Sequence, residues 1–544
     1  MHIPPRAAGA VLGGTAAIAL HASRLGSWLV DDAAITFAYA RSVATGAGPV
    51  LQAGVAPVEA YSNPTWLTLL SFGRLIGLFD RGTLFGLPDQ VVFPKALALL
   101  CCAGVLVAFY RVAAAVTKRP ALVTLVAGLT LAAIPSFVIW SFSGLENSLF
   151  ALAVTWLAAI LCRAAVDERL SAPKVAVTAG LLAAVAALTR PDGIIYAAAF
   201  PVLALLWLPL RQAVLRSLVA VGAFAVPYGA YLVFRVLEFG ELVSGPAIAK
   251  SQGLPELDTL LRPGELVGYV GVLTVLVIAA CVGFVLSQPS PLRTGVIALL
   301  VPLALSVVAY AVLEPDWMGE ARFATPVWAL TALVGTLAVG ATLTRLAPRG
   351  RAVLAVGLVA ALVPTLVTFR DASDKFRADP IVPMCYIAER YGDVFNGYAD
   401  LLGIRHGTVL IPDVGGSALA GRLEIVDYAG LADYDIARFR GDGDPEGLRD
   451  HVFETVRPTF IHTHDPWGWG ITEDPRLALD YVPLYQASPV DGDWVRRDAV
   501  ELGGGARGGG RLASARAYAA RAAQAAVDHD NEAPRRSCTD TYVR

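Results

Sequence analysis

Two adjacent carboxylates, Asp31 and Asp32, follow the first apolar stretch of the chain, in the segment WLVDDAAITFAYARSVATG (28–46). Acids beside a hydrophobic segment are unfavourable unless they have a partner or a chemical task. Two neighbouring carboxylates raise the pKa of one of them, which suits a general base. We therefore predict that at least one of the two is catalytic. The structural alternative is a helix cap next to a solvated acid.

Cations and further acids follow other apolar stretches in the same way. A carboxylate can take a proton from an attacking hydroxyl, while arginine and lysine hold a phosphate and stabilise the charge that develops as it leaves. The candidates for binding such a phosphate, or the group attached to it, are Arg190, Arg235, Lys250, Arg322, Glu146, Asp192, Asp316 and Trp317. Structural alternatives are snorkelling of Arg190, a helix-dipole contact of Glu146 and an interfacial anchor at Trp317.

The composition predicts a membrane protein. Of 544 residues, 56% are hydrophobic and 16% charged, against about 25% charged residues in soluble domains. Apolar blocks that suit membrane helices recur about eleven times. They lie at 8–29, 91–115, 120–140, 146–163, 174–189, 193–210, 214–236, 264–287, 293–313, 324–345 and 351–369. A net charge of −2 gives no basic surface for nucleic acid. We expect an α-helical polytopic protein of the lipid bilayer.

The first block could instead be a cleaved signal peptide. We expect an uncleaved helix, because no clear A-x-A cleavage site precedes Asp31. The apolar segment 63–82 is short and interrupted by Arg74, so we expect it to lie in the membrane interface.

Charge in the loops predicts which side of the membrane each loop occupies. With 63–82 in the interface, basic residues gather in one set of loops, as the positive-inside rule requires, and the N-terminus is cytoplasmic. The outer loops are then 30–90, 141–145, 190–192, 237–263 and 314–323, followed by everything after 370. The candidate residues named above lie in these loops or, as Glu146 and Arg235 do, at the outer ends of the adjoining spans, and so on that face of the cell membrane.

The chain changes character after residue 370. Strand-like runs at 406–413, 423–430 and 458–465 alternate with helix-like stretches. They predict an extracytoplasmic α/β domain over 371–500, behind a transmembrane domain over 1–370 with its outer loop at 30–90. Residues 501–544 indicate a flexible linker and tail, with an Ala-rich helix at 515–527.

Several polar residues of this second domain have open roles. Asp427 and Asp433 are candidates for binding an acceptor. His462 and His464 alternate along a strand, and we interpret them as a strand-end polar cluster rather than a metal pair. The segment PDVGGSALAG (412–421) lacks G-x-G-x-x-G and indicates a strand–turn–helix junction. Cys385 and Cys538 could form a disulfide with each other, but we expect unpaired thiols.

Three functions suit such a chain: transport, an enzyme acting on a lipid-linked substrate, or a scaffold. Transporters usually place polar residues near the midplane of broken helices. Here the predicted spans are nearly free of charge and the charges lie at their outer ends. That distribution favours chemistry at the membrane surface.

Six motifs in order resemble those of actinobacterial arabinofuranosyltransferases, which belong to the GT-C class of polyprenyl-phosphate-sugar glycosyltransferases. The motifs are DDAAITFAYARSVATGAG with PVEAYSNPTW, SGLEN (143–147), LTRPDG (188–193), FRVLEFGELVSGPAIAK (234–250), DWMGEARFATP (316–326) and IVDYAGLAD (425–433). The resemblance covers roughly residues 28–440. The chain departs from the pattern at Ala38, where a basic residue is expected, and at Pro64, Thr65, Asn147 and Asp192.

The resemblance implies an enzyme that moves arabinofuranose from a polyprenyl-phosphate donor to a cell-wall glycan acceptor on the outer face of the membrane. Asp31 or Asp32 would activate the acceptor, and Arg190, Arg322 and Lys250 would hold the donor phosphate. No cofactor is implied with certainty, and a divalent cation is the one candidate; a metal site is not identified. The alternatives are transfer of mannose or another hexose to protein or lipid, and transport of lipid or polysaccharide without chemistry. The anomeric outcome stays open.

Overall fold

The computed structural model describes residues 4–250, 257–314, 317–468, 470–501, 508–532 and 542. It forms two compact units. The helical unit consists of residues 1–26, 94–233 and 254–379, and the mixed unit of 27–93, 234–253 and 380–544. The sequence-based division at residue 370 stays a prediction, while the compact units group the segments 27–93 and 234–253 with the C-terminal part.

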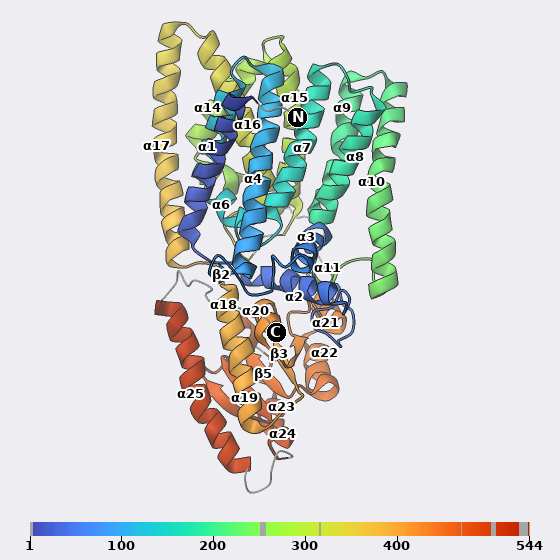
Figure 1. Cartoon of the computed structure of the whole chain (residues 1–544), viewed down its shortest axis with the longest axis vertical. Coiled ribbons are helices and arrows are strands. Elements are labelled where there is room, and N and C mark those ends of the chain that lie inside the picture. Colours follow the sequence, from blue (N-terminus) through green and yellow to red (C-terminus); the bar gives the residue numbers. More distant parts are fainter. Residues whose placement is uncertain are drawn as a thin grey trace. The chain divides into compact units, whose positions relative to one another are not determined.

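The helical unit is built from apolar helices, many of which begin with proline, a residue whose fixed φ suits the first helical position. They are α1 (Pro5–Ala22), α4 (Asp89–Val116), α5 (Pro120–Ala133), α6 (Pro135–Ser141), α7 (Asn147–Val166), α8 (Pro173–Thr189), α9 (Ala199–Trp207), α10 (Leu210–Phe239), α12 (Leu257–Leu261), α13 (Pro263–Val270), α14 (Val272–Leu286), α15 (Pro291–Val312), α16 (Thr325–Arg345) and α17 (Pro348–Ala378). Helix α7 packs against both α8 and α15 (Figure 1).

Six helices of the described residues are long and apolar enough to cross a membrane, or eight if each of two bent pairs counts as one span. They support a multi-pass membrane protein. The count of about eleven expected from hydrophobic blocks is not confirmed. Two of those blocks correspond to shorter apolar helices at Pro173–Thr189 and Pro191–Trp207.

Small residues let α1 pack closely on α5. A Cβ atom built on Gly14 would lie 3.3 Å from the Cα of Gly128, and one built on Gly128 would lie 3.0 Å from the Cα of Gly14. Such contacts let helix backbones approach each other, which favours packing of helices in membranes.

Two predicted spans are broken, and the sequence explains both breaks. Helices α5 and α6 meet at 82°, and the pair 259–270 and 272–286 meets at 100°. Pro135 disfavours helical angles at Ile134, which has φ −85° and ψ 108°. Gly271 has φ 94°, a backbone conformation that residues with a Cβ atom rarely adopt. Each break therefore turns a short helix away from the span it continues.

The mixed unit combines short helices with two sheets. Its helices are α2 (Asp31–Thr45), α3 (Pro64–Leu75), α11 (Gly245–Ala249), α18 (Met384–Ile387), α19 (Val394–Leu402), α20 (Gly415–Ala420), α21 (Tyr434–Gly441), α22 (Pro445–Asp450), α23 (Pro475–Asp480), α24 (Arg497–Glu501) and α25 (Gly508–Glu532). Its strands are β1 (Thr83–Leu84), β2 (Leu87–Pro88), β3 (Thr408–Ile411), β4 (Glu424–Asp427), β5 (Phe460–Thr463), β6 (Tyr481–Gln486) and β7 (Gly492–Arg496).

The larger sheet has the order β4-β3-β5-β7-β6. Strand β3 runs parallel to β4 and β5, with Leu410 opposite Val426 and Ile461. Strand β7 is antiparallel to β5 and β6. The first three strands lie inside the three segments where the sequence predicts strands. Their carboxyl ends share one edge of the sheet, the usual place for ligand sites in α/β folds.

Buried apolar side chains from the sheet and its helices form the core of this unit. Leu410, Ile461 and Trp494 come from strands, and Ile436 and Val452 from the helical segments that cover them. Outside the core, helix α25 covers Gly508–Glu532. The helix expected at 515–527 therefore begins earlier, inside the segment expected to be a linker.

The cysteines correct one expectation. Cys385 is disulfide-bonded, so the prediction of an unpaired thiol at this position is wrong, and Cys538 lies outside the described residues. Cys101, Cys102, Cys162 and Cys281 are free and buried. These four belong to apolar helices, where a thiol behaves as a small hydrophobe.

Candidate functional site

A pocket of about 280 Å³ in the helical unit contains one of the predicted cations, Arg322. Its walls come from α13, α15 and the loop that precedes α16. The lining residues are Arg262, Glu265, Tyr269, Tyr310, Gly319, Glu320, Ala321, Arg322 and Phe323. Because one wall is α13, the pocket lies beside the 100° break between α13 and α14. Non-helical backbone within a membrane segment is tolerated where it is covered by protein or lines a cavity.

The loop that leads to Arg322 has an unusual backbone. Gly319, Glu320 and Ala321 have φ of 64°, 47° and 48°. For residues that carry a Cβ, such a conformation costs on the order of 1–3 kcal/mol. Strain of this kind persists only where the surroundings enforce it, and it clusters at ligand sites. The geometry favours a functional role for this loop.

Arg190 lies in a ring of charged and aromatic groups. It follows α8 in an extended conformation, as expected before Pro191. Its Nη1 donates to Glu146 at 3.1 Å and its Nε to Asp192 at 2.9 Å. All three side chains are at least nine-tenths buried. Burial makes these charge-assisted hydrogen bonds strong, so the two acids fix the orientation of the guanidinium.

Phe323 links the two predicted arginines of this unit. The guanidinium carbon of Arg190 lies 4.7 Å from the Phe323 ring centroid, and that of Arg322 lies 5.7 Å from it. Arg322 also lies 5.6 Å from the ring of Trp140. The structure thus brings Glu146, Asp192 and both arginines together. A pair of cations on an aromatic surface can bind the phosphate of an apolar lipid.

The pocket also contains polar residues that were not predicted from the sequence, among them Arg262, Glu265 and Tyr310. Arg262 donates to the backbone carbonyl of Leu313 and lies 5.0 Å from the Tyr310 ring. The hydroxyl of Tyr310 donates to Glu265 at 2.9 Å. The apolar block 264–287 predicts one span. Gly271 in that run was the available signal for a break that exposes polar residues to a cavity.

In the mixed unit, Asp31 is buried against α20. The backbone N–H groups of Gly415 and Gly416 donate to its Oδ2 and Oδ1, at 3.1 Å and 2.6 Å. Burial, followed by the charge of Asp413, raises the pKa of Asp31 well above its ordinary value. Asp32 is only half-buried in the same helical turn. The geometry therefore favours Asp32 as the acid that contacts a substrate. Asp31 would be the residue that positions Asp32.

Asp413 and His464 form a hydrogen-bonded pair at the sheet edge described above. Asp413 follows β3, and His464 comes directly after β5. Their side chains are 2.7 Å apart, and each is about a quarter exposed. Burial alone would lower the pKa of His464, but the hydrogen bond and charge of Asp413 raise it. Among the described residues, no group of three or more side chains suited to hold a metal ion occurs.

The remaining predicted residues of this unit have mostly structural contacts. Arg235 binds the fully buried Glu59 through two hydrogen bonds of 2.5 Å and 3.2 Å. Lys250 is exposed at the end of α11. Asp427 accepts hydrogen bonds from two backbone N–H groups of its own loop, and burial raises its pKa to about 7. Asp433 caps α21. Acceptor binding by these two acids stays a prediction.

The tryptophan motif is described only in part. Trp317 is 60% exposed, which suits either a sugar platform or an interfacial anchor. Asp316 lies outside the described residues.

A first prediction concerns the support of Asp31. A Cβ atom on Gly415 would lie 2.0 Å from the backbone oxygen of Asp31, so Gly415→Ala should destabilise the protein by about 1–3 kcal/mol through overpacking. Gly222→Ala is the control, because nothing lies within 4 Å of the position that its new methyl group would take. The readout is thermal unfolding of the detergent-solubilised protein. Equal melting temperatures for the two variants would contradict the close contact.

No protein-family model and no curated protein matches the chain. Among solved structures it is similar to the archaeal oligosaccharyltransferase AglB of Archaeoglobus fulgidus, with 13% identity over 83% of this chain and 69% of that chain, TM-score 0.48. It is similar to ArnT of Cupriavidus metallidurans bound to undecaprenyl phosphate, with 16% identity over 81% and 79%, TM-score 0.43.

A third similar structure is the arabinofuranosyltransferase AftD from Mycobacteria, with 15% identity, TM-score 0.49, 83% of this chain and 36% of that chain covered. This is the type of enzyme that the six sequence motifs resemble. Likeness at this distance carries no argument about the activity of the present chain.

Proposed function

We propose that this protein is a GT-C-type membrane glycosyltransferase that transfers arabinofuranose from a polyprenyl phosphate to a cell-wall arabinan. The observation that carries the proposal is the arrangement of Arg190 and Arg322 against Phe323, beside an aromatic-walled pocket at a break in an apolar helix. Cations held within apolar helices are unfavourable unless they have a function. A lipid that bears a phosphate supplies both the charge and the apolar body that such a pocket requires.

The proposed reaction needs no ATP, because the bond between the sugar and the phosphate is already activated. An acceptor hydroxyl attacks the anomeric carbon, and the bond from that carbon to the phosphate oxygen breaks. The hydroxyl proton passes to a carboxylate, for which we propose Asp32. The electron pair leaves with the phosphate, whose added charge Arg190 and Arg322 stabilise.

The cysteines support an extracytoplasmic place for the mixed unit. Cys385 is disulfide-bonded, whereas the four cysteines of the apolar helices are free. Disulfides persist mainly in oxidising compartments outside the cytosol. In the proposal, the sheet side of the protein faces the cell wall and the N-terminus faces the cytoplasm.

The test uses membranes that carry the protein, with radiolabelled polyprenyl-phosphoryl arabinose and an arabinan acceptor. Arg322→Ala should lower transfer by about 10²–10³-fold, the usual cost of removing one group that stabilises transition-state charge. Arg349→Ala is the matched control, because Arg349 is exposed outside the pocket. Transfer by Arg322→Ala that equals transfer by the control would refute the proposed phosphate site.

One observation favours a second candidate function, transport of a lipid-linked sugar without chemistry. Two apolar spans are broken by 82° and 100°, as in transporters that bind their substrates at discontinuous helices. The same assay separates the two functions. A transporter would move the labelled lipid between leaflets of a vesicle and leave its sugar–phosphate bond intact.

A further inference from the structure

A second cavity, of about 450 Å³, lies within the mixed unit and carries three arginines on its wall. One wall is the outer side of α2 with Ala38 and Arg41. The others are the loop at 51–55, Arg74 of α3, and the segment after α20 that includes Arg422. None of the predicted site residues that the structure describes lines this cavity.

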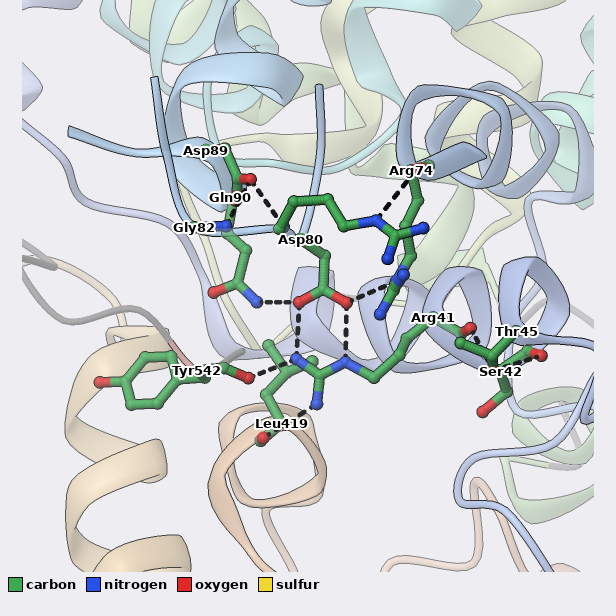
Figure 2. Close-up of polar contacts among 11 residues, drawn as sticks. Arg41, Ser42, Thr45, Arg74, Asp80, Gly82, Asp89, Gln90, Leu419 and Tyr542 are labelled. Atoms are coloured by element: carbon green, nitrogen blue, oxygen red, sulfur yellow. Dashed lines mark hydrogen bonds and ion pairs between the residues drawn. The ribbon is translucent and has the colours of Figure 1, made fainter. Parts of the chain in front are cut away.

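Two of the arginines share a single carboxylate, as Figure 2 shows. Asp80 is fully buried and accepts from Arg41 Nη2 at 2.6 Å and Nε at 2.7 Å. It also accepts from Arg74 Nε at 2.8 Å and from the amide of Gln90 at 2.6 Å. A single carboxylate thus contacts two guanidinium groups.

Arg74 is the less satisfied of the two guanidinium groups. The other guanidinium of the pair is satisfied, because Arg41 also donates to the backbone carbonyls of Leu419 and Tyr542 (Figure 2). Arg74 is 3% exposed, yet its one hydrogen bond goes from Nε to Asp80. Its Nη1 is buried without a partner. A buried cation with unused donors is costly unless an anion completes its surroundings.

The third arginine adds a further guanidinium group to the cavity wall. Arg422 is held at the cavity by a 2.5 Å ion pair with Asp400 and by the backbone carbonyl of Asn396. Glu424 is the one carboxylate among the lining residues, and it is exposed. Planar guanidinium groups match the oxygen geometry of phosphate through paired hydrogen bonds. The space and the donors together suit a phosphate group.

The neighbouring surface indicates where the phosphate comes from. On α3 and just after it, Phe72, Leu75 and Ile76 are 58%, 63% and 52% exposed. At the tip of the β1–β2 hairpin, Phe85 is 97% exposed. Arg74 is thus inward-facing in a segment whose outer side is apolar. Such a segment suits a lipid whose phosphate binds the arginines while its chains contact the apolar side.

We propose that this cavity binds the phosphate group of a membrane lipid. The proposal is independent of the donor site around Arg190 and Arg322 and of the proposed transferase activity. The shared chemistry is a phosphate, which an anionic phospholipid, a polyprenyl phosphate or free phosphate could supply.

The test measures the melting temperature of the purified full chain in detergent as phosphatidylglycerol, a polyprenyl monophosphate or inorganic phosphate is titrated, with phosphatidylcholine as the blank. Either anionic lipid should stabilise the wild type saturably. Arg74→Gln and Arg422→Gln should weaken the apparent affinity about tenfold or more, as expected for loss of a charged hydrogen bond. Arg438→Gln is the control, because Arg438 forms ion pairs with Glu241 and Asp435 and is not among the residues that line the cavity.

Each outcome is decisive. Lipid binding by the control but not by the two cavity variants supports the site. The lipid that binds more tightly, phosphatidylglycerol or the polyprenyl monophosphate, identifies the source of the phosphate. If Arg74→Gln does not fold, Arg422→Gln decides, because its arginine is partly exposed. Saturation by inorganic phosphate alone overturns the assignment to a lipid. Equal lipid affinities of the wild type and Arg422→Gln overturn the site itself.

Discussion

Asp32→Asn is expected to lower the rate of sugar transfer by about 10²–10⁴-fold, the contribution of a general base, while the melting temperature stays within about 1–2 °C of wild type. Asparagine keeps the size of the side chain but cannot accept the proton of the acceptor hydroxyl. Asp32 is half-buried, and the substitution leaves no cavity, so we expect little change in packing. The measurement is transfer of label from polyprenyl-phosphoryl arabinose to arabinan.

Asp31→Asn separates the two neighbouring acids. Asp31 accepts hydrogen bonds from two backbone N–H groups of α20, so its replacement should lower the melting temperature as well as the activity. Asp442→Asn is the control, because Asp442 is exposed at the end of α21. Full activity in Asp32→Asn together with loss in Asp31→Asn would reverse the proposed roles. Full activity in both would remove the catalytic assignment.

Asp493→Ala should destabilise the mixed unit by about 3–5 kcal/mol, the cost of stranding a buried charge. Asp493 is fully buried and accepts from Arg390 at 3.0 Å and from the hydroxyl of Tyr398 at 2.7 Å. It also shares a 2.7 Å hydrogen bond with His462. Without Asp493, the guanidinium of Arg390 would stay buried but would have lost this ion pair. Chemical unfolding followed by tryptophan fluorescence measures the change.

The same residue predicts an acid dependence of stability. Burial alone would raise the pKa of Asp493, but Arg390 and His462 outweigh it and lower that pKa to about 2. In the unfolded chain the pKa of an aspartate is about 3.9. The stabilisation is therefore present above about pH 4 and is lost as pH falls towards 2. Asp435→Ala is the control, because Asp435 forms an exposed pair with Arg438. Equal destabilisation by the two variants would contradict the buried network.

Local patterns in the sequence predicted the apolar helices and three of the sheet strands. The pair of Arg190 and Asp192 is likewise local, because Asp192 lies two residues from Arg190 and Pro191 sets the backbone between them. Those features depend on neighbours in the chain and on hydrophobic periodicity, which a single sequence displays directly.

The features that were missed depend on contacts between distant segments. Asp413 is an ordinary acid in the sequence, and only the parallel pairing of β3 with β5 brings it to His464. The pocket at Arg262 depends on a helix break at Gly271, which is a single glycine in an apolar run. The unsatisfied donor of Arg74 becomes visible only when Arg41 and Asp80 are placed beside it. Interactions of this kind are set by tertiary packing, which composition and spacing do not specify.

The most direct measurement places the purified chain in liposomes with radiolabelled polyprenyl-phosphoryl arabinose and an arabinan acceptor, and follows both products. We expect label to enter the arabinan and one polyprenyl phosphate to be released for each sugar transferred. A folded protein that leaves the donor lipid intact, with no label in the acceptor, would contradict the proposed activity.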